Sequence, residues 1–281
     1  MKSQWDCIRK NLGEWHGSFT QFSSHGDELR DVPSLLKLEE TSAGVIRLVL
    51  IRTPPGESAS EMQRTFTQPG PGPTVPFFDT GAFAQGSTFW SSHSRNGAEL
   101  ALTTPERRVR LVMMYAGLGG RSRLSDVTLI RETQAGSQAS ESSALTVAQL
   151  LGTWEGEGVS ILPDGRIFEG VKSQLVVERR GDRLEQSLRF DEGNGSSDIL
   201  RSKAHIDGCR LLFEDGPFPV QLLMLPGGAS ANGPLEFPSG QAFFLEAGWM
   251  VEPGVRQRLI RRYDSRGDCQ GVTLIRERQV S

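Results

Sequence analysis

The tripeptide Gly13-Glu14-Trp15 returns as Gly152-Thr153-Trp154, and the pentapeptide Thr-Leu-Ile-Arg-Glu stands at 128–132 and again at 273–277. Each tripeptide opens a long stretch of chain, and each pentapeptide closes one. The offset between the copies is 139 residues at the tryptophans and 145 at the arginines. Insertions between the matched blocks account for this difference. The sequence therefore contains one module in two copies.

The length of the copies indicates two related domains. About 130 residues is an ordinary domain size, and it is far longer than the repeat of a solenoid protein. The stretch 134–143 is rich in Ser, Gln and Ala, which is typical of a flexible connector. We therefore predict one domain over 1–136 and a second over 137–281.

Composition excludes several classes of protein. Of the 281 residues 37% are hydrophobic and 23% charged, and the net charge of −3 gives no electrostatic reason to bind nucleic acid or an anionic membrane. No apolar run approaches the ~20 residues of a membrane span, and residues 1–6 do not lead into a signal peptide, so a cytoplasmic location is expected. Cys7, Cys209 and Cys269 lack the spacing of a metal or redox site, and no metal is expected.

Short runs of β-branched and aliphatic residues separated by turn signals dominate both halves. This pattern is typical of antiparallel sandwiches and barrels. We expect strands within 34–38, 45–52, 109–115, 126–132, 172–178, 183–190, 209–214, 255–263 and 271–277. A short helix is predicted before each tryptophan, and the Pro- and Gly-rich segments 69–73 and 225–229 are predicted loops.

A β-barrel must be closed at one end, and the two ends of each copy supply a suitable pair of side chains. A Trp on the first strand offers a flat ring on which a guanidinium from the last strand can stack. We therefore predict that Trp15 pairs with Arg131 and that Trp154 pairs with Arg276. The Gly two residues before each Trp allows close passage of the chain under the barrel.

This Gly-x-Trp with a distant Arg resembles the closure found in the calycin superfamily, the lipocalins and their relatives. The resemblance implies an all-β fold, a tandem repeat of two lipocalin/calycin-like antiparallel β-barrels, each with a short N-terminal helix. It gives the four closing residues an architectural role.

Small barrels that keep an internal cavity usually hold one apolar ligand, oriented by a few polar groups. Arg256 and Arg258 are two positions apart, so on a strand they share a face. If that face is inward, the two guanidinium groups suit an acidic ligand or an internal partner such as Glu246. If it is outward, both arginines are solvated, and Gln257 and Leu259 point inward.

Residues 246–258 read Glu-x-x-Trp-x-x-x-Pro-x-x-Arg-x-Arg, which resembles the signature of the S-type phycobiliprotein chromophore lyases. These calycin-fold proteins deliver open-chain tetrapyrroles to cysteines of antenna proteins. The resemblance implies that Arg256 and Arg258 hold the propionates of a bilin. It also implies that Glu246 bonds the ring nitrogens, that Trp249 stacks on the chromophore, and that a phycobiliprotein acceptor is a partner.

The first half matches this pattern only in part. Pro105, Arg108 and Arg110 correspond, so both arginines are further candidates for ligand binding, but Ala98 stands at the Glu position and Ala101 at the Trp position. We therefore expect the second half to be the more competent in binding a ligand.

The stretches 12–20 (LGEWHGSFT) and 77–83 (FFDTGAF) resemble an uncharacterised two-domain calycin-like family found in cyanobacteria and plastids. This likeness runs nearly end to end. It implies the fold and a photosynthetic setting, but no reaction.

A haem module is a rival interpretation, because residues 151–158 also resemble the first strand of nitrobindin-type proteins. Those proteins need a proximal His late in the barrel. His16, His25, His93 and His205 all lie far from the C-terminal strands, which disfavours haem. Hydrolase and zinc-protease motifs are absent from the sequence.

Three functions stay open. The first is binding or transfer of a hydrophobic acidic small molecule in a β-barrel, above all a linear tetrapyrrole, with chromophore lyase activity as an added expectation. The second is a carrier of a carotenoid derivative or fatty acid. The third is a non-catalytic scaffold whose filled barrels act through their outer surface.

Overall fold

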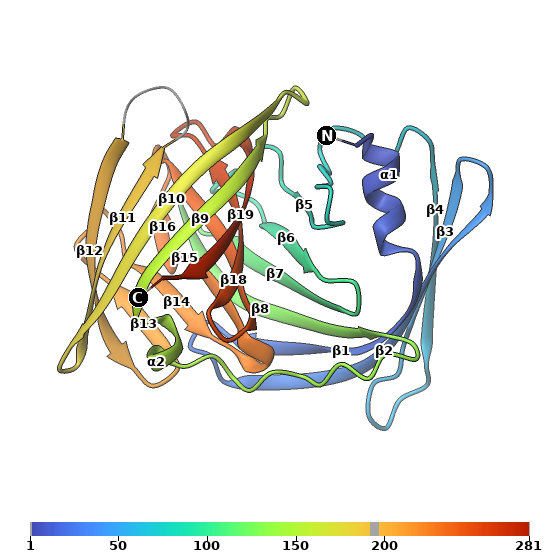
Figure 1. The fold of residues 1–281 in the computed structure, drawn as a ribbon, viewed down its shortest axis with the longest axis horizontal. Coiled ribbons are helices and arrows are strands. Elements are labelled where there is room, and N and C mark those ends of the chain that lie inside the picture. Colours follow the sequence, from blue (N-terminus) through green and yellow to red (C-terminus); the bar gives the residue numbers. More distant parts are fainter. Residues whose placement is uncertain (1, 192–196, 281) are drawn as a thin grey trace.

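The computed structural model describes residues 2–191 and 197–280, and it confirms the all-β class. Antiparallel sheets make up both halves, and a short helix precedes the first strand of each (Figure 1). Eight of the nine expected strands lie within observed ones, and the ninth, 209–214, extends one residue beyond each end of the observed strand at Arg210–Phe213. Within the described ranges, no helix has the length and apolar character needed to cross a bilayer.

The first half forms one curled sheet that does not close. Its strands follow the order β4-β3-β2-β1-β8-β7-β6-β5, with β4 and β5 at the ends of this path. The elements are α1 (Gln4–Ile8), η1 (Arg9–Asn11), β1 (Gly13–Ser23), β2 (Glu28–Ser42), β3 (Val45–Arg52), β4 (Ser60–Thr67), β5 (Phe83–Gly86), β6 (Asn96–Thr103), β7 (Arg107–Gly117) and β8 (Arg121–Gln134).

The second half is a closed barrel of ten strands in the order β10-β11-β12-β13-β14-β15-β17-β18-β19-β9. Its elements are α2 (Val147–Leu150), β9 (Gly152–Ile161), β10 (Ile167–Arg180), β11 (Arg183–Asp191), β12 (Ser197–Asp207), β13 (Arg210–Phe213), β14 (Val220–Met224), η2 (Pro226–Gly228), β15 (Ala229–Pro234), β16 (Glu236–Pro238), β17 (Phe243–Glu252), β18 (Val255–Tyr263) and β19 (Cys269–Gln279).

The two halves differ by the pair β13 and β14. Counted from the first strand of each half, β1 to β4 correspond to β9 to β12, and β5 to β8 correspond to β15 and β17 to β19. In the first half, the segment 68–82 stands in place of the missing pair. It contains four prolines, at 69, 71, 73 and 76, and proline cannot donate a ladder hydrogen bond. The first of the two predicted barrels is therefore an open half-barrel.

The largest hydrophobic core lies between the halves. It joins outward-facing side chains of both sheets, among them Leu100, Leu111, Leu245 and Leu259. Full burial of such a side chain contributes about 1.5–3 kcal/mol. The short strand β16 of the second half pairs with β8 of the first. The halves are thus packed as one body, although the repeat predicts a domain boundary near 136.

The concave side of the first sheet holds a separate, smaller core. Trp5 and Ile8 of α1 pack there with Trp15, Leu36 and Ile46. Figure 1 shows α1 on this side, between β5 and the β3–β4 hairpin. The helix partly plugs the half-barrel.

Candidate functional site

Each tryptophan of the repeated tripeptide stacks on an arginine, but not on the predicted one. The Arg108 guanidinium lies 4.6 Å from the centre of the Trp15 ring, and that of Arg256 lies 5.0 Å from the Trp154 ring. Both indole N–H groups donate to a carbonyl four residues earlier. The predicted pairs with Arg131 and Arg276 are wrong.

The register of the first and last strands explains this correction. Trp15 lies opposite Gln134, so Glu132 shares its face while Arg131 lies on the other. There Arg131 donates to Glu141, at 2.6 Å, and to Thr20. In the second half the same parity leaves Arg276 exposed. It is the Glu, not the Arg, of each Thr-Leu-Ile-Arg-Glu segment that faces inward.

The sequence predicts that the glycine of each tripeptide allows the chain to pass closely under the barrel. Gly13 and Gly152 have φ values of 127° and 105°, a region that favours glycine. A Cβ on Gly13 would lie 3.0 Å from Nε2 of Gln134, and the approach is closer still two residues after each Trp. A Cβ on Gly17 would lie 1.9 Å from the Arg131 carbonyl oxygen, and one on Gly156 would lie 2.8 Å from Glu277.

A buried ion network lies inside the second barrel. Glu277 pairs with Arg256, at 2.8 Å from Nε, and with Arg258, at 3.0 Å. Arg258 also makes two bonds, of 2.8 and 2.7 Å, to Glu246. All four side chains are buried. Of the two orientations left open by the sequence, the inward one with Glu246 as partner is therefore observed.

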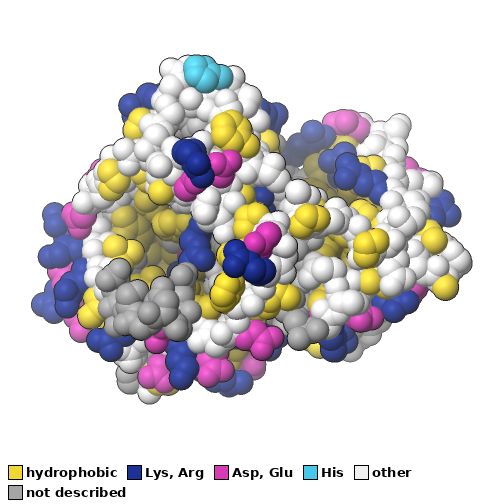
Figure 2. All heavy atoms as spheres, turned by 90° about the horizontal axis from the view of Figure 1, so that it is seen from above, with side chains coloured by type: hydrophobic (Ala, Val, Ile, Leu, Met, Phe, Trp, Pro, Cys, Tyr) yellow, Lys and Arg dark blue, Asp and Glu magenta, His cyan; other side chains and the backbone are white. Residues whose placement is uncertain are grey.

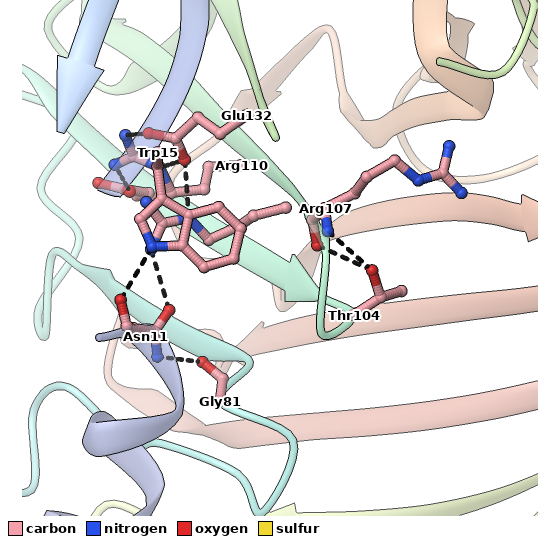
Figure 3. Close-up of polar contacts among 9 residues, drawn as sticks. Asn11, Trp15, Gly81, Thr104, Arg107, Arg110 and Glu132 are labelled. Carbon is pink, nitrogen blue, oxygen red and sulfur yellow. Dashed lines mark hydrogen bonds and ion pairs between the residues drawn. The ribbon is translucent and has the colours of Figure 1, made fainter. Parts of the chain in front are cut away.

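The first half contains the same network. Glu132 accepts from Arg108 at 2.7 Å and from two nitrogens of Arg110 at 3.0 and 3.1 Å, and Arg110 donates to Glu99 at 2.7 Å. Asn11 accepts a further bond from Arg108 at 3.0 Å. Figure 3 shows Arg110 and Glu132 close to Trp15, while the side chain of Arg107 points away from them.

Glu99 occupies the place of Glu246, which corrects the expectation that the first half lacks this carboxylate. Glu246 lies two residues before the strand partner of Arg258, and Glu99 lies two residues before the partner of Arg110. The register shifts by one residue between Met250 and Glu252. This bulge inserts one residue into β17. An alignment of the two halves without a gap therefore places Ala98, and not Glu99, at the position of Glu246.

Both networks are charge-neutral, since each contains two arginines and two glutamates. Burial alone would raise the pKa of Glu132, but the charges of Arg108 and Arg110 lower it to about 2. The pKa of Glu277 is likewise lowered by its two arginines against the effect of burial. The glutamates therefore already satisfy the charges of the arginines.

Trp249 does not share the face of Glu246. Three positions separate them on β17, so they point to opposite sides of the barrel wall. Trp249 lies in the core between the halves, where its indole N–H donates to Gly227 and the Arg107 guanidinium lies 5.4 Å from its ring. The prediction that Trp249 stacks on a ligand inside the barrel with Glu246 is wrong.

A cavity of about 290 Å³ lies on the concave side of the first sheet. Hydrophobic side chains from α1 and the strands form most of its wall. They are Ile8, Phe19, Leu36, Leu38, Leu48, Leu50, Met62, Phe66, Val75, Phe77, Phe83, Val112 and Ile130. The polar side chains of the wall include Arg108, Arg110 and Glu99 of the network, together with Arg64. Figure 2 shows hydrophobic side chains set between basic ones over the right-hand part of the molecule, where the first half lies.

Arg64 differs from the other arginines of this cavity. It extends from β4 opposite Leu48, on the face that also carries Met62 and Phe66. Among the described residues, no hydrogen bond or ion pair engages its guanidinium, and the side chain is exposed at the mouth. Sequence patterning missed Arg64 because β4 carries no motif. The described residues hold no cluster of three or more His, Cys, Asp or Glu side chains suited to a metal.

Comparison with known proteins shows the family to which the chain belongs. Residues 1–137 match the family model for the N-terminal domain of unknown function DUF3598. A crystal structure of a DUF3598 protein of unknown function from Nostoc punctiforme is 38% identical, with 100% of both chains covered and a TM-score of 0.90. The chain belongs to the DUF3598 family. The resemblance to an uncharacterised two-domain family is thereby supported.

Other comparisons are more distant. Residues 141–280 match the family model described as the C-terminal domain of biogenesis factor required for ATP synthase 1. The S-type phycobiliprotein lyase CpeS of Guillardia theta is 13% identical over 48% of this chain and 90% of its own, with a TM-score of 0.40. No curated protein is significantly similar to this DUF3598 chain.

Proposed function

We propose that the first half of this DUF3598 protein binds an apolar molecule that carries an acidic group. The observation that supports the proposal is the combination of a mostly hydrophobic cavity with one guanidinium, that of Arg64, which has no partner among the described residues. Apolar walls favour a hydrocarbon body. An unpaired arginine at the mouth favours a carboxylate, because its donors match two carboxylate oxygens.

The six residues predicted to bind ligand take different roles in this proposal. Arg108 and Arg110 form part of the polar floor of the cavity, although Glu132 and Glu99 already neutralise them. In the other half, Glu246 and Glu277 already bind Arg256 and Arg258 in a charge-neutral network. Arg64 is therefore the group that we expect to meet the acid.

A fatty acid or a carotenoid acid fits the cavity better than a bilin does. Sites that enclose a drug-sized ligand measure roughly 300–1,000 Å³, and this cavity of about 290 Å³ lies at the lower limit. A linear tetrapyrrole would extend well beyond the walls. The alternative and more specific form of the proposal is bilin binding, with lyase activity and a phycobiliprotein acceptor.

The test uses two probes, cis-parinaric acid by fluorescence and phycocyanobilin by absorbance. Arg64→Gln should weaken cis-parinaric acid binding about tenfold, the effect of ~1.4 kcal/mol, and Met62→Trp should abolish it by filling the cavity. Arg47→Gln is the matched control, because this exposed arginine lies on the opposite face of neighbouring β3. Failure of both probes to bind, or wild-type affinity in both cavity variants, would refute the proposal.

A second candidate function is assistance in protein assembly without a small ligand. It is favoured by the match of residues 141–280 to the C-terminal domain of a biogenesis factor for ATP synthase. The direct test is sedimentation of the purified chain with intact ATP synthase and with its dissociated subunits. Absence of a complex with every subunit would exclude this candidate.

A further inference from the structure

The free edge of β4 is the feature of the half-barrel that no ligand in the cavity would use. In the closed barrel, the strand that corresponds to β4 is β12, and β13 pairs with it. In the open sheet, the only strand that pairs with β4 among the described residues is β3. The opposite end of the sheet is partly covered, because Phe77 forms a bridge to Phe83 of β5 and Ala84 donates to Pro76.

The register shows which backbone groups of β4 face this edge. The amide of Gln68 donates to Gly44, which makes the even-numbered residues of β4 the ones bonded to β3. The N–H groups of Glu61, Gln63 and Thr65 therefore point away from the sheet. Within residues 2–191 and 197–280, no backbone hydrogen bond to these three groups is formed.

The strand itself is accessible and regular. All its residues except Phe66 are exposed, it runs over eight residues, and its register with β3 shows no bulge. Natural proteins usually protect such an edge with proline, a bulge, an inward-pointing charge or a covering segment. Of these devices β4 has only the inward-pointing charge of Arg64.

Arg64 disfavours pairing of β4 with a second copy of itself. Two copies of β4 can pair antiparallel, centred on each other and with their cavity-facing side chains on the same side, in two registers. Arg64 then lies opposite the Arg64 of the other copy or, two positions away, opposite its Met62. Like charges directly opposite each other destabilise a sheet. The same charge favours a strand from another protein that places an acidic residue there.

We propose that an extended segment of a partner protein adds to the free edge of β4, with an acidic side chain opposite Arg64 and apolar side chains two positions to each side, facing Met62 and Phe66. Backbone bonds to Glu61, Gln63 and Thr65 supply affinity, and the alternating side chains supply selectivity. The added strand takes the place that β13 occupies in the second barrel. The inference does not require a small molecule in the cavity, but an acid bound at Arg64 would compete with the acidic side chain of the added strand for the same guanidinium.

The probe is a blocked peptide of sequence Thr-Val-Thr-Glu-Thr-Val-Thr, followed by hydrogen exchange and by fluorescence anisotropy. We expect it to slow exchange at Glu61, Gln63 and Thr65. Replacement of its Glu by Lys should weaken binding at least about tenfold. In the protein, Thr65→Pro removes an edge N–H and should weaken binding to a similar degree, whereas the matched control Thr65→Ala keeps that N–H and should bind normally.

Three results would overturn the inference. The first is no protection of the three amides at about 1 mM peptide, and the second is equal binding to Thr65→Pro and Thr65→Ala. The third is a dimer of the chain, seen by sedimentation, that Thr65→Pro dissociates. Thr65 points away from the cavity, so retained cis-parinaric acid binding in Thr65→Pro separates failure at the edge from failure of the cavity proposal.

Discussion

The carboxylate of Glu132 holds two buried guanidinium groups, so removing its charge should destabilise the first half. We consider Glu132→Gln, which preserves the size of the side chain. The native side chain is fully buried and accepts three hydrogen bonds, one from Arg108 and two from Arg110. The glutamine keeps one acceptor oxygen but directs an NH2 group at guanidinium donors.

Two independent estimates of the cost agree. The pKa of Glu132 falls from its ordinary 4.5 to about 2, and at ~1.4 kcal/mol per pKa unit this corresponds to about 3 kcal/mol of stability. Breaking a buried ion pair by removing one partner costs about 3–5 kcal/mol in other proteins. We therefore expect Glu132→Gln to lose about 3–4 kcal/mol of unfolding free energy at pH 7.

The pH dependence has a definite sign. A carboxyl with a depressed folded-state pKa contributes stability above its unfolded-state pKa, here near 4.5, and loses that contribution as the pH falls toward 2. The variant lacks this titration. The difference in unfolding free energy between wild type and Glu132→Gln should shrink by about 2 kcal/mol between pH 7 and pH 3.

Urea unfolding followed by circular dichroism at both pH values measures this difference. Glu14→Gln is the matched control, because that carboxylate is on the same sheet but is partly exposed and pairs with Lys37. We expect no measurable change there. A loss below about 1 kcal/mol at pH 7, or an equal loss at pH 3, would refute the reasoning about Glu132.

Three further predictions use other parts of the structure. Gly17→Ala should lower the free energy of unfolding in urea by about 2–3 kcal/mol, because the new Cβ meets a backbone carbonyl at 1.9 Å. The control Gly216→Ala, whose nearest atom is at 3.7 Å, should be nearly neutral, and equal losses in the two variants would contradict the packing. A double-mutant cycle of Arg107→Ala and Trp249→Leu, which removes the aromatic ring, should give a coupling energy of about 0.5–2 kcal/mol, and a value near zero would exclude a stabilising contact between these two side chains. Burial and a bond to Asp79 raise the pKa of Cys7 to about 12, so iodoacetamide at pH 8 should label exposed Cys209 first in mass-spectrometric mapping; equal labelling rates would argue against the buried site.

The fold class could be predicted from the sequence because its signals are local. Alternating apolar residues and turn residues report strands one at a time, and the repeated tripeptide reports the duplication. The open first sheet was not predicted, although the prolines at 69, 71, 73 and 76 carry a signal for it. Four prolines in eight residues cannot supply the donors of two ladder strands.

The candidate site was predicted by residue type but not by geometry. Arg256, Arg258 and Glu246 do meet inside the barrel, as expected from the two-residue spacing of the arginines. The partners of the tryptophans were wrong because a motif does not reveal which of two adjacent residues faces inward. Strand register decides that, and it depends on neighbours more than a hundred residues away. Arg64 was missed as a site residue because only its position in the wall of the cavity makes it a candidate for ligand binding.

The core between the halves also determines whether either half of this duplicated chain can exist without the other. Because the outward faces of β6, β7 and β8 are buried against the second half, either half expressed alone would expose a broad apolar surface and aggregate. A single cut in the connector should have the opposite outcome. The two fragments would stay associated as an obligate heterodimer does, and they would separate only on unfolding.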